Sequence, residues 1–156
     1  MVMIDLITGF LGSGKTTFLK KYAEYLMDQG LHIGILENDF GAINVDMLML
    51  HELRGDQCEL EMIAGGCDAE SHRRRFRTKL ISMRMCGYDR VLVEPSGIYD
   101  VDEFFDVLRE EPLDQWYEIG NVIAILDARL EKNLSQQADY LLAVSYTHLR
   151  AHETGA

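Results

Sequence analysis

The sequence holds little proline and cysteine, and fewer basic than acidic side chains. Only 2 of its 156 residues are proline and 13 are glycine, so low-complexity and fibrous classes do not fit. No apolar run approaches the roughly 18–20 residues that a membrane-spanning helix needs, so we expect no membrane span and no membrane partner. The 15 basic and 26 acidic residues give a formal net charge of −11. This argues against nucleic acid as a partner, because Lys and Arg supply most phosphate affinity.

The first residues also lack a basic start and a small-residue cleavage site, so we expect no secretory signal. The 3 cysteines, Cys58, Cys67 and Cys86, cannot all pair within one chain, and we interpret them as reduced thiols of a cytoplasmic protein. Apolar sequence, in contrast, is abundant: hydrophobic residues make up 47% and charged residues 26%. This composition predicts a globular domain with a substantial core.

Apolar runs rich in Val, Ile and Leu alternate with segments of helical periodicity. Strands are predicted at residues 3–8, 32–37, 59–63, 90–94, 121–127 and 140–144. Helices are predicted at residues 15–29, 71–86, 101–109 and 129–137. Such alternation requires crossover connections, so we predict an α/β fold with a doubly wound, mostly parallel sheet.

The strongest functional signal lies between the first predicted strand and the first predicted helix. Residues 9–16 read Gly-Phe-Leu-Gly-Ser-Gly-Lys-Thr, which fits the phosphate-loop pattern. The glycines allow backbone N–H groups to surround an anion, and the following helix directs its positive end toward the same phosphates. Lys15 is expected to neutralise β- and γ-phosphate oxygens, and the Thr16 hydroxyl to bind Mg²⁺. The alternative is a coincidental glycine-rich turn.

Carboxylates stand where two predicted strands end. Glu94 ends an apolar strand, and Gly97 follows shortly after it. Because strand carboxyl ends line the ligand crevice of a doubly wound sheet, we expect Glu94 to reach Mg²⁺ or its waters and the Gly97 N–H to sense a γ-phosphate. At residues 37–41 the sequence is Glu-Asn-Asp-Phe-Gly, where Glu37 and Asp39 are candidates to bind a metal or to orient an attacking water. The alternatives are an acid that merely ends a strand and a solvated acidic loop.

Two weaker signals follow the third predicted strand. Cys67 lies after two glycines, with acidic residues and His72 just beyond, so we expect at most one weak zinc or cobalt site built from Cys67 with Glu37, Asp39 or His72. A buried structural cysteine is the alternative. Residues 72–84 form a basic helix whose charges are expected to lie on a solvated face. An acidic partner surface or a second subunit's phosphates are the alternatives.

Taken together, the motifs resemble the CobW/HypB/UreG group of P-loop GTPases, in particular its CobW-like branch. The resemblance rests on Gly-Phe-Leu-Gly-Ser-Gly-Lys-Thr-Thr at 9–17, Glu-Asn-Asp-Phe-Gly at 37–41, Gly-Gly-Cys at 65–67 and Glu-Pro-Ser-Gly at 94–97. It covers about residues 1–144 and implies a P-loop NTPase fold, GTP binding and slow Mg²⁺-dependent hydrolysis. It also implies a switch coupled to delivery of zinc, cobalt or a similar metal to a client protein.

Carried onto this sequence, the family motifs give a set of candidate residues. Nucleotide-binding candidates are Gly12, Ser13, Gly14, Lys15, Thr16, Thr17 and Gly97. Catalytic candidates are Lys15, Asp39 and Glu94. Metal candidates are Thr16 for Mg²⁺, Glu94 through the waters around Mg²⁺, and Cys67 and Glu37 for a transition metal. A homodimer is a further expected partner. A P-loop kinase of a small molecule and a non-catalytic nucleotide-sensing module are the alternative functions.

The sequence departs from the family pattern at several positions. The family usually carries Gly-Cys-x-Cys-Cys after the third strand, but Ala69 and Glu70 stand here, so only Cys67 matches. In the family's guanine-reading motif the Lys is replaced by Tyr146 and the Asp by His148, so we expect poor guanine preference. Residues 145–156 resemble read-through of a sequencing adapter. We therefore expect an incomplete GTPase domain at 1–144 and a tail that is not part of the fold, the alternative being a genuine divergent C-terminus.

Overall fold

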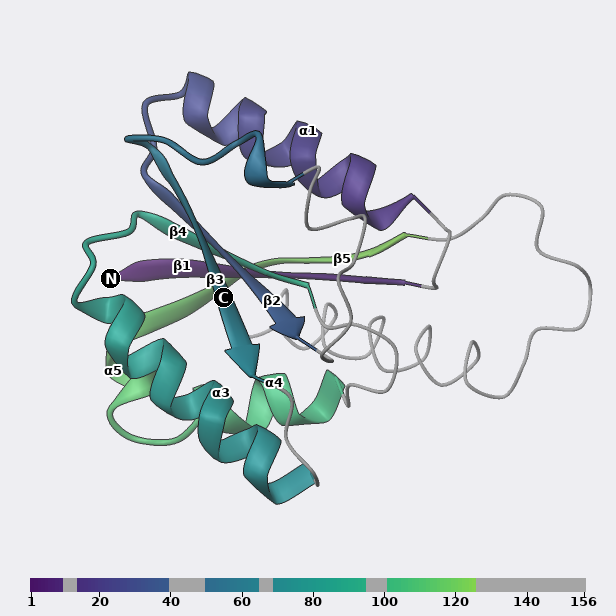
Figure 1. Ribbon diagram of the computed structural model, residues 1–156. Helices are drawn as coiled ribbons and strands as arrows, with labels where there is room; N and C mark the ends of the chain where they lie inside the picture. The colour runs from purple at the N-terminus through teal and green to yellow at the C-terminus, as the bar shows by residue number, and fades with distance from the viewer. Residues whose placement is uncertain (10–13, 40–49, 65–68, 95–100, 126–156) are drawn as a thin grey trace, which may run out of the picture.

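The computed structural model describes residues 1–9, 14–39, 50–64, 69–94 and 101–125 (Figure 1). Its strands are β1 (Val2–Gly9), β2 (Ile33–Asp39), β3 (Cys58–Ala64), β4 (Arg90–Glu94) and β5 (Tyr117–Ile125). Its helices are α1 (Lys15–Asp28), α3 (Ala69–Arg84), α4 (Val101–Leu108) and α5 (Leu113–Trp116). The strands form one sheet in the order β3-β2-β4-β1-β5, and every neighbouring pair is parallel.

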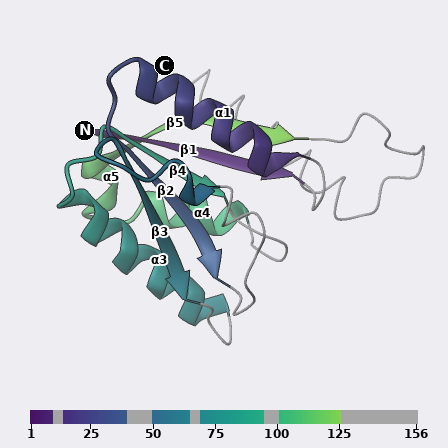
Figure 2. The ribbon, with the colours of Figure 1, turned by 45° about the horizontal axis from the view of Figure 1, so that its top comes forward.

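Helices cover both faces of this sheet, which confirms the predicted doubly wound α/β fold. Figure 1 shows α1 on one face and α3, α4 and α5 on the other, and Figure 2 shows the same layers after a 45° turn. Alternate residues of each strand face opposite sides, so Ile4 and Leu6 of β1 join the core beneath α3, whereas Ile7 joins the core beneath α1. The predicted apolar stripe of α3 is buried, since Phe76, Leu80 and Met83 are at most 1% exposed.

The predicted element boundaries hold for most of the described chain. One difference is the start of β5, which begins at Tyr117 rather than at residue 121, because Glu118 and Gly120 interrupt the apolar pattern. A second is the four-residue helix α5, which is too short to produce a helical repeat in the sequence. The predicted helix at 129–137 and strand at 140–144 lie outside the described residues.

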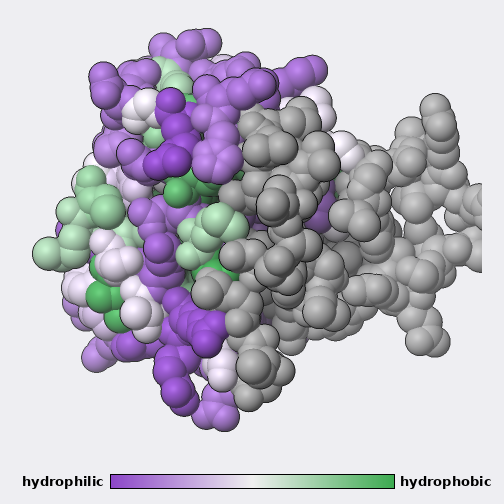
Figure 3. All heavy atoms as spheres, in the orientation of Figure 1, coloured by the Kyte–Doolittle hydropathy of each residue, from purple (hydrophilic) through white to green (hydrophobic). Residues whose placement is uncertain are grey.

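The basic side chains of α3 mostly contact carboxylates of the protein itself. Arg73 and Arg77 both pair with Glu110 after α4, and the Lys79 Nζ lies 2.7 Å from a Glu61 oxygen on β3. The hydrogen bond from Arg73 lowers the pKa of Glu110 and burial raises it, and the net shift is downward. Figure 3 shows polar side chains over α1 and over α3, with apolar ones between them. These pairs support the interpretation of the basic helix as a surface of this domain.

Within the described residues, no helix combines the length and the apolar character needed to cross a membrane.

Candidate functional site

Glycines with left-handed backbones bound the loop between β1 and α1. Gly9 has a φ of 144° and Gly14 a φ of 91°, values that side chains disfavour. At Gly9 a Cβ atom would also lie 2.2 Å from the carbonyl oxygen of Ile125 on β5. The loop therefore joins a strand to a helix N-terminus as the sequence predicts, although Gly12 and Ser13 lie outside the described residues.

The first turn of α1 is suited to an anion. Gly14 is its N-cap and makes no side-chain capping bond, and the first turn contains no acidic residue. The first N–H groups of a helix have no partner within the helix, and its N-terminus carries a partial positive charge. Thr16 is 7% exposed, whereas Thr17 on the next position faces solvent. A phosphate placed before α1 would satisfy these donors.

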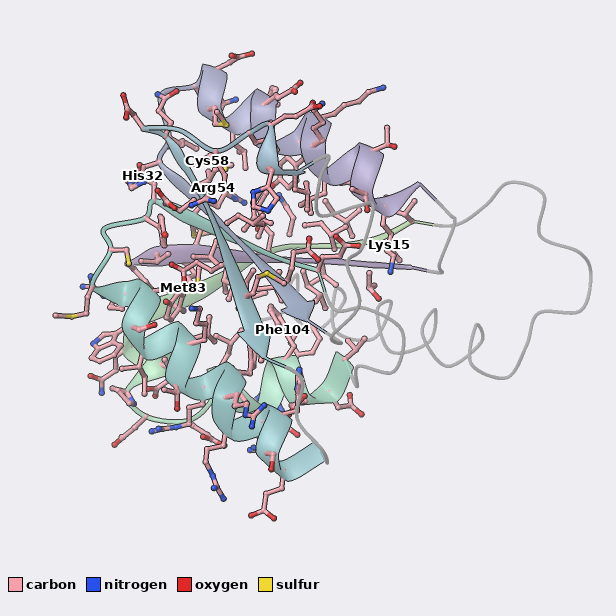
Figure 4. The ribbon with its side chains drawn as sticks, in the orientation of Figure 1. Lys15, His32, Arg54, Cys58, Met83 and Phe104 are labelled. Carbon is pink, nitrogen blue, oxygen red and sulfur yellow. The ribbon has the colours of Figure 1, made fainter. Side chains whose placement is uncertain are left out.

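Lys15 is a buried ammonium group at the carboxyl end of the sheet. Its residue is only 7% exposed, and its Nζ lies 4.0 Å from Oε1 of Glu94. Figure 4 shows Lys15 where α1 begins, far from Cys58, which starts β3 at the opposite end of the sheet. Because a buried ammonium is costly unless it is paired, the long contact with Glu94 leaves Lys15 well suited to a stronger anionic partner.

Two buried carboxylates lie side by side at the carboxyl end of the sheet, where Lys15 also lies. Glu37 on β2 is in register with Glu94 on the neighbouring strand β4, and each residue is 6% exposed. Backbones of adjacent strands are about 4.7–4.9 Å apart, so these like charges are close. Together with Lys15, the three groups carry a formal charge of −1, from two carboxylates and one ammonium. The two carboxylates and the Thr16 hydroxyl at the start of α1 are oxygen groups of the kind that bind a hard cation such as Mg²⁺.

The remaining predicted site residues are less completely described. Asp39 ends β2 opposite Ala64, with its side chain outside the described part, and Cys67 and Gly97 lie outside the described residues altogether. His72 is described: its Nδ1 lies 2.9 Å from Oε2 of Glu103, which links α3 to α4. Among the described residues, no three His, Cys, Asp or Glu side chains form a group that could hold a metal. The roles assigned to these residues stay predictions.

Of the two free cysteines that the structure describes, the buried Cys58 is a poor metal ligand. Cys58 is buried in the core beneath α1, and burial together with Glu59 raises the pKa of its thiol to about 11. It therefore stays protonated at neutral pH, whereas metal binding requires the thiolate. Cys86 is exposed near the end of α3 and its Sγ contacts the Ser82 carbonyl oxygen at 3.7 Å.

One polar residue of the sheet was missed by the sequence analysis. Asp5 stands in the middle of the apolar strand β1 and is fully buried, with Arg90 of β4 and Tyr22 of α1 bonded to its carboxylate. A lone acid inside an apolar strand was the available signal, because such a residue needs a buried partner.

Comparison with known sequences identifies the family. The sequence model of the CobW/HypB/UreG nucleotide-binding domain matches residues 3–147. This chain belongs to the CobW/HypB/UreG family. It is 31% identical over 141 residues to the zinc chaperone YeiR of Escherichia coli K12, an alignment that covers 88% of this chain and 42% of YeiR. It is 32% identical over 139 residues to the zinc chaperone YjiA of the same organism, which covers 81% of this chain and 41% of YjiA.

Solved structures agree on the fold of this CobW/HypB/UreG domain. The signal recognition particle receptor FtsY from Elizabethkingia anophelis matches with a TM-score of 0.56 at 14% identity, covering 95% of this chain and 47% of the receptor. A de novo designed protein with a P-loop NTPase fold matches with a TM-score of 0.51 at 13% identity, covering 96% of this chain and 93% of the design. At these identities the likeness concerns the fold, which is that of a P-loop NTPase.

Proposed function

We propose that this chain binds GTP with Mg²⁺, hydrolyses it slowly and couples its nucleotide state to the transfer of zinc or a similar metal to a client protein. The observation that carries the proposal is the buried Lys15 at the start of α1, 4.0 Å from Glu94, which is in register with Glu37 on the neighbouring strand. Family membership and the two zinc chaperone relatives support it.

In this proposal the protein's own groups do most of the work by positioning and charge. Lys15 exchanges its 4.0 Å contact with Glu94 for the β- and γ-phosphate oxygens, and the N–H groups at the start of α1 bind the same phosphates. The Thr16 hydroxyl and the carboxylate of Glu94 hold Mg²⁺ directly or through its waters. Mg²⁺, when bound, supplies further neutralisation of phosphate charge. Asp39 is assigned to orient the attacking water.

The central test is a calorimetric titration of the chain with GTP and Mg²⁺, followed by measurement of released phosphate. Binding without hydrolysis would favour the nucleotide-sensing alternative, and phosphate transfer to an added small molecule would favour a kinase. No binding of any nucleoside triphosphate would overturn the proposal.

Thr16→Ala and Glu94→Gln are expected to reduce Mg²⁺-dependent nucleotide binding or turnover about 10- to 100-fold, and Mg²⁺-independent binding much less. Each change removes an oxygen or a charge from the Mg²⁺ donor set and leaves Lys15 in place. The measurement is nucleotide affinity and phosphate release across a Mg²⁺ titration. Matched controls are Thr78→Ala on α3 and Glu118→Gln on β5, both exposed positions. Normal Mg²⁺ dependence in both site variants would show that the roles are wrong.

Cys67→Ser is expected to weaken zinc or cobalt binding at least tenfold, because the thiolate is the soft donor of the proposed transfer site. Affinity in the wild type should rise with pH, since metal binding deprotonates the thiol, and should change when a non-hydrolysable GTP analogue is bound. The measurement is metal titration with and without the analogue. Cys86→Ser, which removes an exposed free thiol, is the control. Equal affinity in Cys67→Ser and wild type would remove the metal role from Cys67.

A further inference from the structure

A polar network joins α1 to the sheet about two helical turns from Lys15. Its centre is the fully buried carboxylate of Asp5 on β1. The Asp5 Oδ2 accepts hydrogen bonds from Arg90 Nε at 2.5 Å and from the Tyr22 hydroxyl at 2.6 Å. The Asp5 Oδ1 accepts from Arg90 Nη2 at 3.0 Å and from the backbone N–H of Asn121 at 2.6 Å. Four donors from three other elements therefore satisfy one carboxylate.

The backbone of β5 is shaped around this network. Ile4 of β1 pairs with Ile119 of β5, but Leu6 pairs with Val122, so β5 has one extra residue between these two pairs. At this bulge a Cβ atom on Gly120 would lie 2.3 Å from the Asp5 Oδ1. Bulges of this kind redirect local backbone groups, and here the Asn121 N–H points at Asp5.

Tyr22 connects the network to the helix that begins at the phosphate loop. Its hydroxyl donates to Asp5 and accepts a 2.9 Å hydrogen bond from the Asn121 Nδ2. Burial and the hydrogen bond to Asp5 raise the pKa of Tyr22, so the hydroxyl keeps its proton at neutral pH. Tyr22 lies seven residues after Lys15, which is about two helical turns and places both side chains on the sheet-facing side of α1.

The helix α1 therefore makes polar contacts with the sheet at two positions along its axis. At its first residue, Lys15 contacts Glu94 of β4, and two turns later Tyr22 contacts Asp5 of β1. Arg90 and Glu94 belong to the same strand, and Asp5 lies four residues before Gly9, so the network joins three of the elements that carry the candidate site: α1, β1 and β4.

We propose that the network of Asp5, Tyr22, Arg90 and Asn121 positions α1, and through it Lys15 and Thr16, for binding the phosphates of a nucleotide. The inference rests on the proposed function. When Lys15 exchanges Glu94 for a phosphate, α1 loses its polar contact with β4 at its first residue. The hydrogen bond between Tyr22 and Asp5 is kept. The network then fixes the axial position and rotation of α1 while the phosphate binds. None of its residues touches the phosphates, so they are positioning residues.

The test is Tyr22→Phe, which removes the hydroxyl and keeps the ring. Affinity for GTP with Mg²⁺ is measured by calorimetry at a temperature where a thermal melt shows each variant fully folded. We expect Tyr22→Phe to bind about three- to tenfold more weakly, because small displacements of positioned groups are costly. Asn121→Ala, which removes one bond to the Tyr22 hydroxyl, should show a smaller loss. The matched control is Tyr25→Phe on the same helix, since Tyr25 is 61% exposed and should bind as the wild type does.

A purely structural role predicts a different pattern. It lowers the melting temperature of Tyr22→Phe but leaves the affinity of the folded protein unchanged, and that result would overturn the inference. Equal weakening in Tyr25→Phe would also overturn it, because the effect would then belong to any change on α1. If the wild-type chain binds no nucleotide, the proposed function itself is overturned. If the wild type and Tyr22→Phe bind nucleotide equally well, only this inference is overturned.

Discussion

Lys15→Ala is expected to abolish measurable binding of nucleoside triphosphate while the chain stays folded. Lys15 is 7% exposed and stands at the start of α1, so in the proposed complex its charge meets phosphate with little competing water. Removing one donor of a preorganised anion site costs about 3–4 kcal/mol, which corresponds to roughly a 100- to 1000-fold loss of affinity. Calorimetric titration with GTP and Mg²⁺ measures this loss directly.

The matched control for Lys15→Ala is Lys20→Ala on the same helix. Its ammonium already pairs with the exposed Glu52 at 2.6 Å, so its loss should leave nucleotide affinity unchanged. A thermal melt of both variants checks that the fold persists. Affinity equal to wild type in Lys15→Ala would show that the loop between Gly9 and Lys15 does not hold phosphate.

Asp5→Ala is expected to lower the free energy of unfolding by about 3–5 kcal/mol, the largest stability effect we predict for this protein. The change removes the acceptor of four hydrogen bonds and leaves the partly buried Arg90 guanidinium without its carboxylate. Breaking one side of a buried pair costs more than the pair contributes, because the remaining charge is no longer compensated. Urea denaturation with linear extrapolation measures the loss.

Two further variants test the reason for that loss. Asp106→Ala removes a surface carboxylate that lies 3.6 Å from Arg109, and is expected to cost at most about 1 kcal/mol. The double variant Asp5→Leu with Arg90→Met removes both charges and should recover much of the stability lost in Asp5→Ala. A loss below about 1 kcal/mol in Asp5→Ala itself would contradict the buried-pair account.

The sequence predicts the parts of this fold whose signals are local. The phosphate loop is a contiguous motif, and the Val, Ile and Leu runs are continuous because their strands are covered on both faces. The sequence also predicts that Glu37 and Glu94 lie at the carboxyl ends of strands, whereas the structure shows that their two strands are neighbours.

The parts that could not be predicted depend on contacts between distant segments. Asp5 is separated from Arg90 by 85 residues and from Asn121 by 116, so no local pattern links them. His72 illustrates the same limit: no local pattern shows that the fold brings Glu103, 31 residues away, against its ring. Its metal role stays a prediction. Side-chain partners of this kind are set by packing between elements rather than by sequence spacing.

The strand order has a consequence for how a ligand site can arise. The connections that follow the neighbouring strands β1 and β4 run in opposite directions across the sheet (Figure 1). The connection through α1 runs from β1 to β2 over one face, and the connection through α4 and α5 runs from β4 to β5 over the other. The carboxyl ends of β1 and β4 therefore form a topological switch point, the place where open α/β sheets generally bind their ligands. Substitutions at Glu94, which ends β4, can therefore change what binds at this switch point without changing the strand order that creates it.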